Sequence, residues 1–496
     1  MTESPKSSKT PKRNGSWWRK NWFYTVLIAV ALLGGLGAFW IPFRLPQPFS
    51  KGDSISTLRQ SILAATGGIL AILTLWENRR KNIQEKEKND QDHTRQVHAE
   101  RRSRYAKAIE QLADEKAPIR LGGIYTLVKL VDEWLADEKT LPNEEERREE
   151  GQVIVNSLCA YIRSPFDLVP KAEVLSQDQT PENYEGGDQQ FVKDRARFRE
   201  EQEIRHIILS EIKKRLNGDK VKNKEITQIT PGTWSYFEYN FSDAHFFYAV
   251  NFNNSYFGAS LNFLGATFTG YVNFSGATFT QVIFSGATFT QVIFSGATFT
   301  RRTDFSGATF TRRTDFSGAT FTRRTDFSGA TFTQVIFFGA TFTHDADFTM
   351  AAFTHDADFR WVTFTHDADF TSVTFTGEAS FIMATFTGYA NFSGATFTHD
   401  ADFSSATFTG EASFLQGADF RRVTFHGEPS FIGVLGKARF SYKVIPEDYR
   451  FEVDPDSPCK IETEEQEYNG VKFRIPKGAT LFDPDEPSEQ KDDNDS

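Results

Sequence analysis

Cysteine and methionine are scarce in this chain of 496 residues, which has only two cysteines and three methionines. Cys159 and Cys459 are 300 positions apart, so the sequence supports neither a disulfide framework nor a cysteine-rich metal site, and it fits a reducing compartment. Apolar residues make up only 39% of the chain, although phenylalanine alone occurs 50 times. So uneven a composition argues against an ordinary mixed core and indicates an internal repeat.

Recognisable catalytic groupings are also missing from the sequence. No nucleophile has a base placed beside it, no glycine loop of the phosphate-binding kind occurs, and no pair of catalytic carboxylates stands out. Cys159 lies in an apolar helical stripe, which is typical of a small core residue rather than a nucleophile. We therefore expect a protein that is not an enzyme, with no catalytic residues, no cofactor and no bound metal.

Charge is distributed unevenly along the chain. The net charge is −10 overall, with +5 on residues 1–233, −6 on residues 234–441 and −9 on residues 442–496. The N-terminal part is therefore the part expected to prefer anionic surroundings.

Two uncharged stretches near the N-terminus are long enough to cross a bilayer. Residues 21–43 are 23 uncharged positions, about 34 Å as a helix, and residues 60–76 are 17 more. Basic residues precede the first stretch and follow the second, so the positive-inside rule predicts a multi-pass protein with both termini in the cytoplasm. A signal peptide is the alternative, but the first stretch is too long and no cleavage site follows it. Close packing of the two helices is expected at Gly34, Gly35, Gly37, Gly67 and Gly68.

Helical patterns continue beyond the apolar stretches. Residues 77–104 are rich in both charges and contain no proline or glycine, which predicts a solvated helical stalk. Apolar residues at helical spacing then predict a small helical domain over residues 105–233, with residues 166–194 as a linker inside it. Gly122 and Gly123 interrupt this pattern, which indicates that two helices approach closely there.

Thirty-four phenylalanines between Phe252 and Phe431 stand in register, each five or six residues after the one before. A helix has 3.6 residues per turn and a strand has a period of 2, so neither explains this spacing. A solenoid does explain it, if each side presents one inward ring and then turns a corner. The small residue two positions earlier, as Ala277 before Phe279, fits beside the ring. Four sides per coil predict about eight and a half coils, most of 22 residues in place of 20, with the extra residues enlarging corners.

This repeat resembles that of the pentapeptide-repeat proteins, in which a large apolar residue is central and a small one precedes it by two. Residues 104–134, above all 108–112 and 120–125, together with residues 156–165, resemble the juxtamembrane domain of bacterial membrane-anchored members. The resemblance implies a right-handed quadrilateral β-helix and a place in the bacterial cytoplasmic (inner) membrane. The expected organisation is a basic cytoplasmic tail (1–20), a two-helix transmembrane hairpin (21–76), the stalk, the small all-α domain, the β-helix (234–441), and an acidic cap with a disordered tail (442–496).

Copying of the repeat places like side chains on successive coils. Three Arg-Arg pairs form a basic collar, and an acidic sleeve follows, with ten acids between Phe342 and Glu411. His344 and His366 fall on one corner, where copying explains them without a metal. Thirteen Thr-Phe-Thr units form threonine arrays that also resemble ice-binding solenoids, although a cytoplasmic location argues against that use. The candidate interaction surface consists of Arg301, Arg302, Arg312, Arg313, Arg323, Arg324, Asp345, Asp356 and Asp367.

These features predict a membrane-anchored, non-enzymatic scaffold whose cytoplasmic β-helix serves protein-protein interaction. Its expected partners are the lipid bilayer and a cytoplasmic protein that the sequence does not identify, and a homo-oligomer is compatible with the same surface. The alternative is a DNA-mimicking β-helix that binds or inhibits a topoisomerase, a role known for acidic rods of the family; the arginine collar argues against it. Binding of nucleic acid or anionic lipid by the collar is the least favoured hypothesis.

Overall fold

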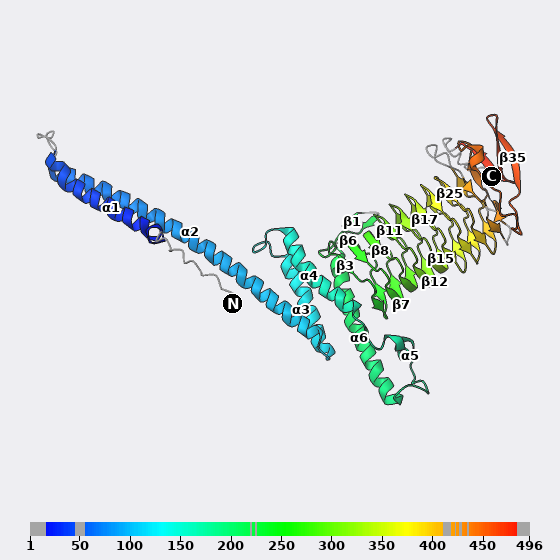
Figure 1. The fold of residues 1–496 in the computed structure, drawn as a ribbon, viewed down its shortest axis with the longest axis horizontal. Helices are drawn as coiled ribbons and strands as arrows, with labels where there is room; N and C mark the ends of the chain where they lie inside the picture. The colour runs from blue at the N-terminus through cyan, green and yellow to red at the C-terminus, as the bar shows by residue number, and fades with distance from the viewer. Residues whose placement is uncertain are drawn as a thin grey trace, which may run out of the picture. The chain divides into compact units, whose positions relative to one another are not determined.

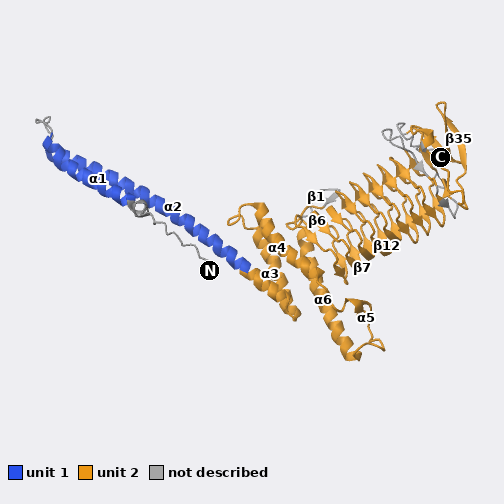
Figure 2. Cartoon of the chain, in the orientation of Figure 1, with its two compact units in different colours: residues 1–102 blue, residues 103–496 orange. Residues whose placement is uncertain are grey.

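The structure is a computed structural model that describes residues 16–44, 55–218, 221–223, 226–409, 418–421, 423–425, 429–433 and 436–483. It divides into two compact units, residues 1–102 and residues 103–496 (Figure 2). Most of the predicted basic tail (1–15) and the predicted disordered end (484–496) lie outside the described residues.

The first unit contains two long apolar helices. They are α1 (Ser16–Arg44) and the N-terminal part of α2 (Ile55–Leu112), and both are long and apolar enough to cross a membrane. A Cβ atom at Gly34 would overlap the side chain of Thr66, so the helices touch there, as predicted. Gly35, Gly67 and Gly68 have no such neighbour. The charged stretch predicted as a stalk is helical, because α2 continues through it without a break.

The second unit begins with a helical part that consists mainly of α3 (Ala117–Leu135), α4 (Glu144–Arg163) and α6 (Gly187–Leu216). Asn143 caps α4 by accepting a hydrogen bond from the backbone N–H of Glu145. These helices bury the apolar stripes seen in the sequence, including Ile124, Leu158 and Ile208. The helical part therefore has its own share of the core.

The predicted linker over residues 166–194 is only partly a loop. It includes η1 (Val169–Lys171) and α5 (Ala172–Leu175), and α6 already begins at Gly187. Phe191 is buried and Asp194 accepts a hydrogen bond from Tyr184 at 2.7 Å, which anchors the first turns of α6. One buried ring among polar residues is too sparse a pattern for a helix prediction.

The rest of the second unit is a β-solenoid of about eight turns (Figure 1). Its two sheets run along the solenoid axis, and strands of successive coils pair in parallel. Thr298 pairs with Thr278 of the preceding coil and with Thr320 of the next, so coils of 20 and 22 residues follow one another, as predicted.

Each sheet collects the strands of two sides of the solenoid. The first sheet contains β3 (Tyr239–Asn240), β6 (Tyr256–Asn262), β8 (Thr278–Ile283), β10 (Thr298–Phe299), β11 (Thr303–Asp304), β13 (Thr320–Phe321), β14 (Thr325–Asp326), β16 (Thr341–Phe342), β17 (Ala346–Asp347), β20 (Thr363–Phe364), β21 (Ala368–Asp369), β24 (Thr385–Phe386), β25 (Ala390–Asn391), β28 (Thr407–Phe408), β29 (Ala418–Asp419), β34 (Arg439–Ser441) and β37 (Thr480–Phe482). The second sheet contains β4 (His245–Phe246), β5 (Val250–Asn251), β7 (Thr267–Asn273), β9 (Thr288–Ile293), β12 (Thr309–Asp315), β15 (Thr331–Ile336), β18 (Ala352–Phe353), β19 (Ala357–Asp358), β22 (Thr374–Phe375), β23 (Ala379–Ser380), β26 (Thr396–Phe397), β27 (Ala401–Asp402), β30 (Thr424–Phe425) and β31 (Pro429–Ser430). Three antiparallel pairs lie outside these sheets: β1 (Val221–Asn223) with β2 (Ile226–Gln228), β32 (Ile432–Gly433) with β33 (Gly436–Lys437), and β35 (Thr463–Tyr468) with β36 (Val471–Pro476).

Two kinds of corner alternate around each coil. At the tight corner, as at residues 274–277, the N–H of Ala277 bonds the carbonyl of Phe274 at 3.0 Å and Gly276 has a φ of 63°. The side chain of Asn273 accepts the N–H of Ser275, which explains the Asn or Asp before many of the phenylalanines. At the wide corner the strand register shifts between Phe310 and Arg313, so the extra residue enlarges this corner, as predicted.

The core is a set of stacked aromatic columns. The ring of Phe321 lies 4.6 Å from those of Phe299 and Phe342, within 5° of parallel, and meets the neighbouring column at Phe327 edge to face. Ala277 and the equivalent small residues are buried beside the rings. Because burial of one ring contributes roughly 2 to 3 kcal/mol, the columns stabilise a fold that has few other apolar groups.

Both ends of the columns are covered by other segments of the second unit. At the N-terminal end, Phe247 lies 5.1 Å from Phe198 of α6, and Trp234 donates a hydrogen bond to Asp132 of α3 at 2.9 Å. At the C-terminal end, Phe451 stacks 5.7 Å from Phe420, and β37 extends the first sheet by pairing with β34. Ring edges and strand edges that an open solenoid would expose are thereby protected.

Candidate functional site

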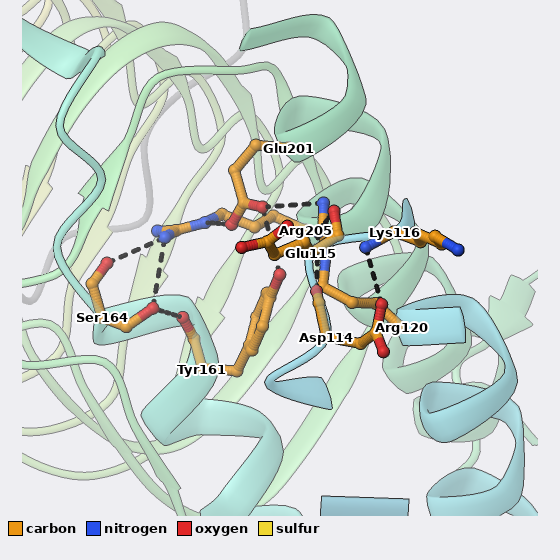
Figure 3. Close-up of polar contacts among 8 residues, drawn as sticks. All are labelled: Asp114, Glu115, Lys116, Arg120, Tyr161, Ser164, Glu201 and Arg205. Carbon is orange, nitrogen blue, oxygen red and sulfur yellow. Dashed lines mark hydrogen bonds and ion pairs between the residues drawn. The ribbon is translucent and has the colours of Figure 1, made fainter. Parts of the chain in front are cut away.

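An ionic cluster lies at the centre of the helical part (Figure 3). The carboxylate of Glu201 on α6 accepts hydrogen bonds from Nε of Arg205 at 2.7 Å and from the hydroxyl of Tyr161 at 3.1 Å. Arg120 of α3 lies 3.6 Å from the same carboxylate, and its side chain and that of Glu201 are 12% and 9% exposed. One buried carboxylate therefore links α3, α4 and α6.

The two arginines of this cluster also close helix ends. Arg205 donates to the carbonyls of Ile162 and Ser164 at 2.8 Å, where α4 ends, and Arg120 donates to the carbonyls of Asp114 and Glu115 between α2 and α3. These carbonyls lie at or just beyond the ends of helices, where backbone partners run out, and the guanidinium groups bind them. The arrangement positions helices and offers no nucleophile.

Two groups near the cluster remain protonated at neutral pH. Burial, together with the Glu201 carboxylate, raises the pKa of Tyr161, so its hydroxyl stays a donor. Burial raises the pKa of the Cys159 thiol to about 12. The interpretation of Cys159 as an inert core residue is thereby supported.

The residue block that carries the family resemblance has a structural explanation. A Cβ atom at Gly123 would come within 2.8 Å of the carbonyl oxygen of Ala108, so α2 and α3 touch there, as predicted. Gly122 has no neighbour within 4 Å. Arg120 and Gly123 together stabilise the turn between α2 and α3. This turn leads into the helices that cover the N-terminal end of the solenoid.

The arginines of the collar are placed as the repeat spacing predicts. Arg301, Arg302, Arg323 and Arg324 lie at one wide corner of the first sheet, where they line an open groove of about 720 Å³. Arg312 and Arg313 belong to β12 in the second sheet. The structure therefore separates the six arginines into a four-residue group and a two-residue group.

Many acids of the sleeve are engaged with the backbone. Asp347, Asp358, Asp369 and Asp402 each accept the N–H two residues further on, at 2.8 to 3.0 Å. Asp356 and Asp367 accept backbone N–H groups of the next coil at 3.1 and 3.0 Å. These carboxylates keep their charge, but each also closes a turn or connects two coils, so the fold itself accounts for their presence.

The histidines stack as the repeat predicts. The rings of His344 and His366 lie 5.1 Å apart and within 5° of parallel. Over the part of the chain that the structure describes, no three histidine, cysteine, aspartate or glutamate side chains are grouped so as to hold a metal ion.

One surface feature was missed by the sequence analysis. At a tight corner of three successive coils, larger residues replace the Ser of the repeat's Ser-Gly, and in two of these coils the Gly as well. We call this set the bulky corner: Phe338, Arg360, Trp361, Ile382 and Met383. Backbone hydrogen bonds connect these coils, from Gly339 to Arg360 and from Trp361 to Ile382, both at 3.0 Å. The signal was present in the sequence as a departure from the copied unit.

The bulky corner is exposed and locally strained. The side chains of Phe338 and Trp361 are 43% and 52% exposed. Trp361 has a φ of 61° and Met383 a φ of 57°, where most coils have glycine. The Arg360 guanidinium lies 5.6 Å from the Phe338 ring centre and forms two bonds with Asp358, at 2.8 and 2.7 Å. The corner is therefore aromatic, apolar and internally charge-balanced.

Comparison with known proteins identifies the repeat. Residues 263–309, 294–341, 305–351 and 362–407 match the family model described as "Pentapeptide repeats (9 copies)". Nine chains of solved structures match the protein, among them HetL, a pentapeptide repeat protein involved in heterocyst differentiation regulation from the cyanobacterium Nostoc sp. strain PCC 7120. HetL is 19% identical over 40% of this chain and 86% of its own, with a TM-score of 0.15. Among curated proteins, none is similar enough to match. This chain is a pentapeptide-repeat β-solenoid protein.

Proposed function

We propose that this protein is a non-enzymatic, membrane-anchored scaffold whose solenoid binds a protein partner through the bulky corner. The observation that carries the proposal is Trp361, a half-exposed tryptophan at a tight-corner position where most coils have glycine or a small polar residue. A non-glycine residue with this backbone conformation costs about 1 kcal/mol, and about half of the tryptophan remains exposed to solvent. A partner that buries the ring offsets this cost.

The chemistry of the bulky corner favours a protein as that partner. Tryptophan, phenylalanine, methionine and arginine are the residues enriched in protein interfaces. Because Asp358 neutralises Arg360, the corner carries no net charge, and the complementary surface is expected to be apolar. The four candidate arginines at the wide corner of the first sheet would then border this contact.

The apolar helices support membrane anchoring. α1 and the start of α2 meet the length and hydropathy required of membrane spans. The basic residues before the first helix and after the second favour a hairpin with both termini in the cytoplasm, in the inner membrane of a bacterium. The solenoid would then be held near the inner face of the membrane.

Site-specific photo-crosslinking in cells tests the proposed partner surface. A photoreactive phenylalanine derivative at position 361 is expected to give a discrete adduct with one protein. The matched control is position 372, because Ser372 is exposed, has a φ of 56° and lies on the opposite tight corner. Equal adducts at both positions, or none at position 361, would contradict the proposal.

A further inference from the structure

The arginine groove contains two arginines that are held by ion pairs and two that are not. Nη2 of Arg302 lies 3.5 Å from Asp326, and Nη2 of Arg324 lies 3.2 Å from Asp347, each on the next coil. These pairs fix the second arginine of each corner against the solenoid. In the described part of the chain neither Arg301 nor Arg323 has an ion-pair partner, and Nη1 of Arg323 lies 3.1 Å from Nε2 of His344.

Arg301 and Arg323 occupy equivalent places on consecutive coils. The strands before them pair Phe299 with Phe321, and the strands after them pair Thr303 with Thr325. Equivalent backbone positions are therefore one strand spacing apart, about 4.8 Å. Two guanidinium groups so placed can direct their N–H forks at one tetrahedral dianion, whereas one carboxylate would balance only half of their charge.

The groove also lies beside the proposed partner surface. In the chain, Phe338 and His344 stand on either side of the short Thr-Phe strand β16, so the bulky corner and the arginine corner border the same side of the solenoid. The groove is open, whereas sites for small molecules usually enclose most of their ligand. A segment of a bound protein can therefore reach Arg301 and Arg323 from the same side.

We propose that this groove receives a phosphorylated side chain of the protein partner, with Arg301 and Arg323 as its donors. The inference rests on the proposed function and specifies the chemistry of the partner. His344 borders the site through its contact with Arg323, and Ile283 forms part of the wall.

Fluorescence anisotropy with the full chain in detergent tests this inference. The probes are a degenerate peptide library with a central phosphoserine, the same library without phosphate, and glycerol 3-phosphate as a competitor. The phosphorylated library is expected to bind at least tenfold more tightly than the unphosphorylated one. The double variant Arg301→Gln, Arg323→Gln should weaken that binding at least tenfold, and Arg301→Lys, Arg323→Lys should weaken it less because the charge remains.

The chain offers a matched control for loss of charge. Arg312→Gln with Arg313→Gln removes the same charge from the other sheet, where Gln334 stands on the next coil, and should change the affinity less than twofold. Equal losses in both double variants, no preference for the phosphorylated library, or competition by glycerol 3-phosphate at the affinity of the library would each overturn the inference. A retained adduct at position 361 alongside such a result would leave the scaffold proposal standing.

Discussion

At the scale of single residues, Trp361 is a residue whose presence is better explained by binding at the surface than by the needs of the fold. Its backbone has the conformation that glycine adopts in most other coils, and half of its side chain is exposed. The tight corner itself therefore does not require a large side chain at this position. An exposed residue with a strained backbone is a candidate for a role in binding.

Substitution of this tryptophan should not harm the fold. For Trp361→Gly we expect the free energy of unfolding to change by no more than about 1 kcal/mol, because relief of the backbone strain opposes the loss of the buried half of the ring and the added freedom of the unfolded chain. Chemical denaturation measures this. The neighbouring Val362→Gly should instead cost about 2 kcal/mol or more, since Val362 is buried in the core. A large loss of stability for Trp361→Gly would assign the ring a structural role.

Glu201 represents the opposite case, a charge that the fold requires. Glu201→Gln leaves the buried Arg205 without its counter-charge, and breaking a buried pair of this kind costs about 3 to 5 kcal/mol. Glu200→Gln is the matched control, because Glu200 is exposed on the same helix. Thermal unfolding of both variants gives the comparison, and equal midpoints would show that the cluster does not stabilise the helical part.

At the scale of elements, the sequence predicts the solenoid better than its ends. The spacing of phenylalanine reports the number of sides, and the sixth residue reports the wide corner seen between Phe310 and Arg313. Both features arise from local repetition, which a single sequence displays directly. The start of α6 and the packing of Phe247 on Phe198 depend on contacts between segments that are distant in the sequence, so no local sequence pattern predicts them.

The candidate surface was likewise predictable only where it follows from the repeat. The repeat spacing places the arginine pairs on their corners, but it does not show that Asp326 and Asp347 hold Arg302 and Arg324. It also does not show which acids close turns. The sequence shows the bulky corner as a departure from the repeat, but only the backbone φ angles show that it is strained.

Because each coil contacts mainly its neighbours, whole coils should be removable. Deletion of residues 305–326, one coil of 22 residues, joins strands that already have matching partners, and we expect the melting temperature to fall by only a few degrees. Deletion of residues 305–309 is shorter, yet it would stack Thr-Phe strands on the other strand type and tight corners on wide ones. Circular dichroism should show cooperative unfolding for the first variant and not for the second; the reverse order would contradict the four-sided coil.

At the scale of the whole molecule, two apolar helices are joined in one chain to a solenoid with a repetitive surface. No feature of the described residues favours catalysis, and the use of acids in turns gives no support to the DNA-mimic alternative. A tethered binding surface is the function that we propose for these parts.

Membrane anchoring can be tested by extraction. The full chain should remain in the membrane pellet after treatment with alkaline carbonate and dissolve only in detergent, because two apolar spans are not displaced by pH or salt. A chain from which residues 16–76 are deleted should appear in the soluble fraction. Release of the full chain by carbonate would indicate peripheral attachment instead.

The most direct test of the scaffold account restores the residues of the repeat to the bulky corner. Phe338→Ser with Trp361→Gly recreates the Ser-Gly corner, so the solenoid should keep its melting temperature. Co-purification from detergent-solubilised membranes should then recover the protein crosslinked at position 361 at least about tenfold less well than the unmodified chain does. Undiminished recovery of that protein by the correctly folded double variant would contradict the account.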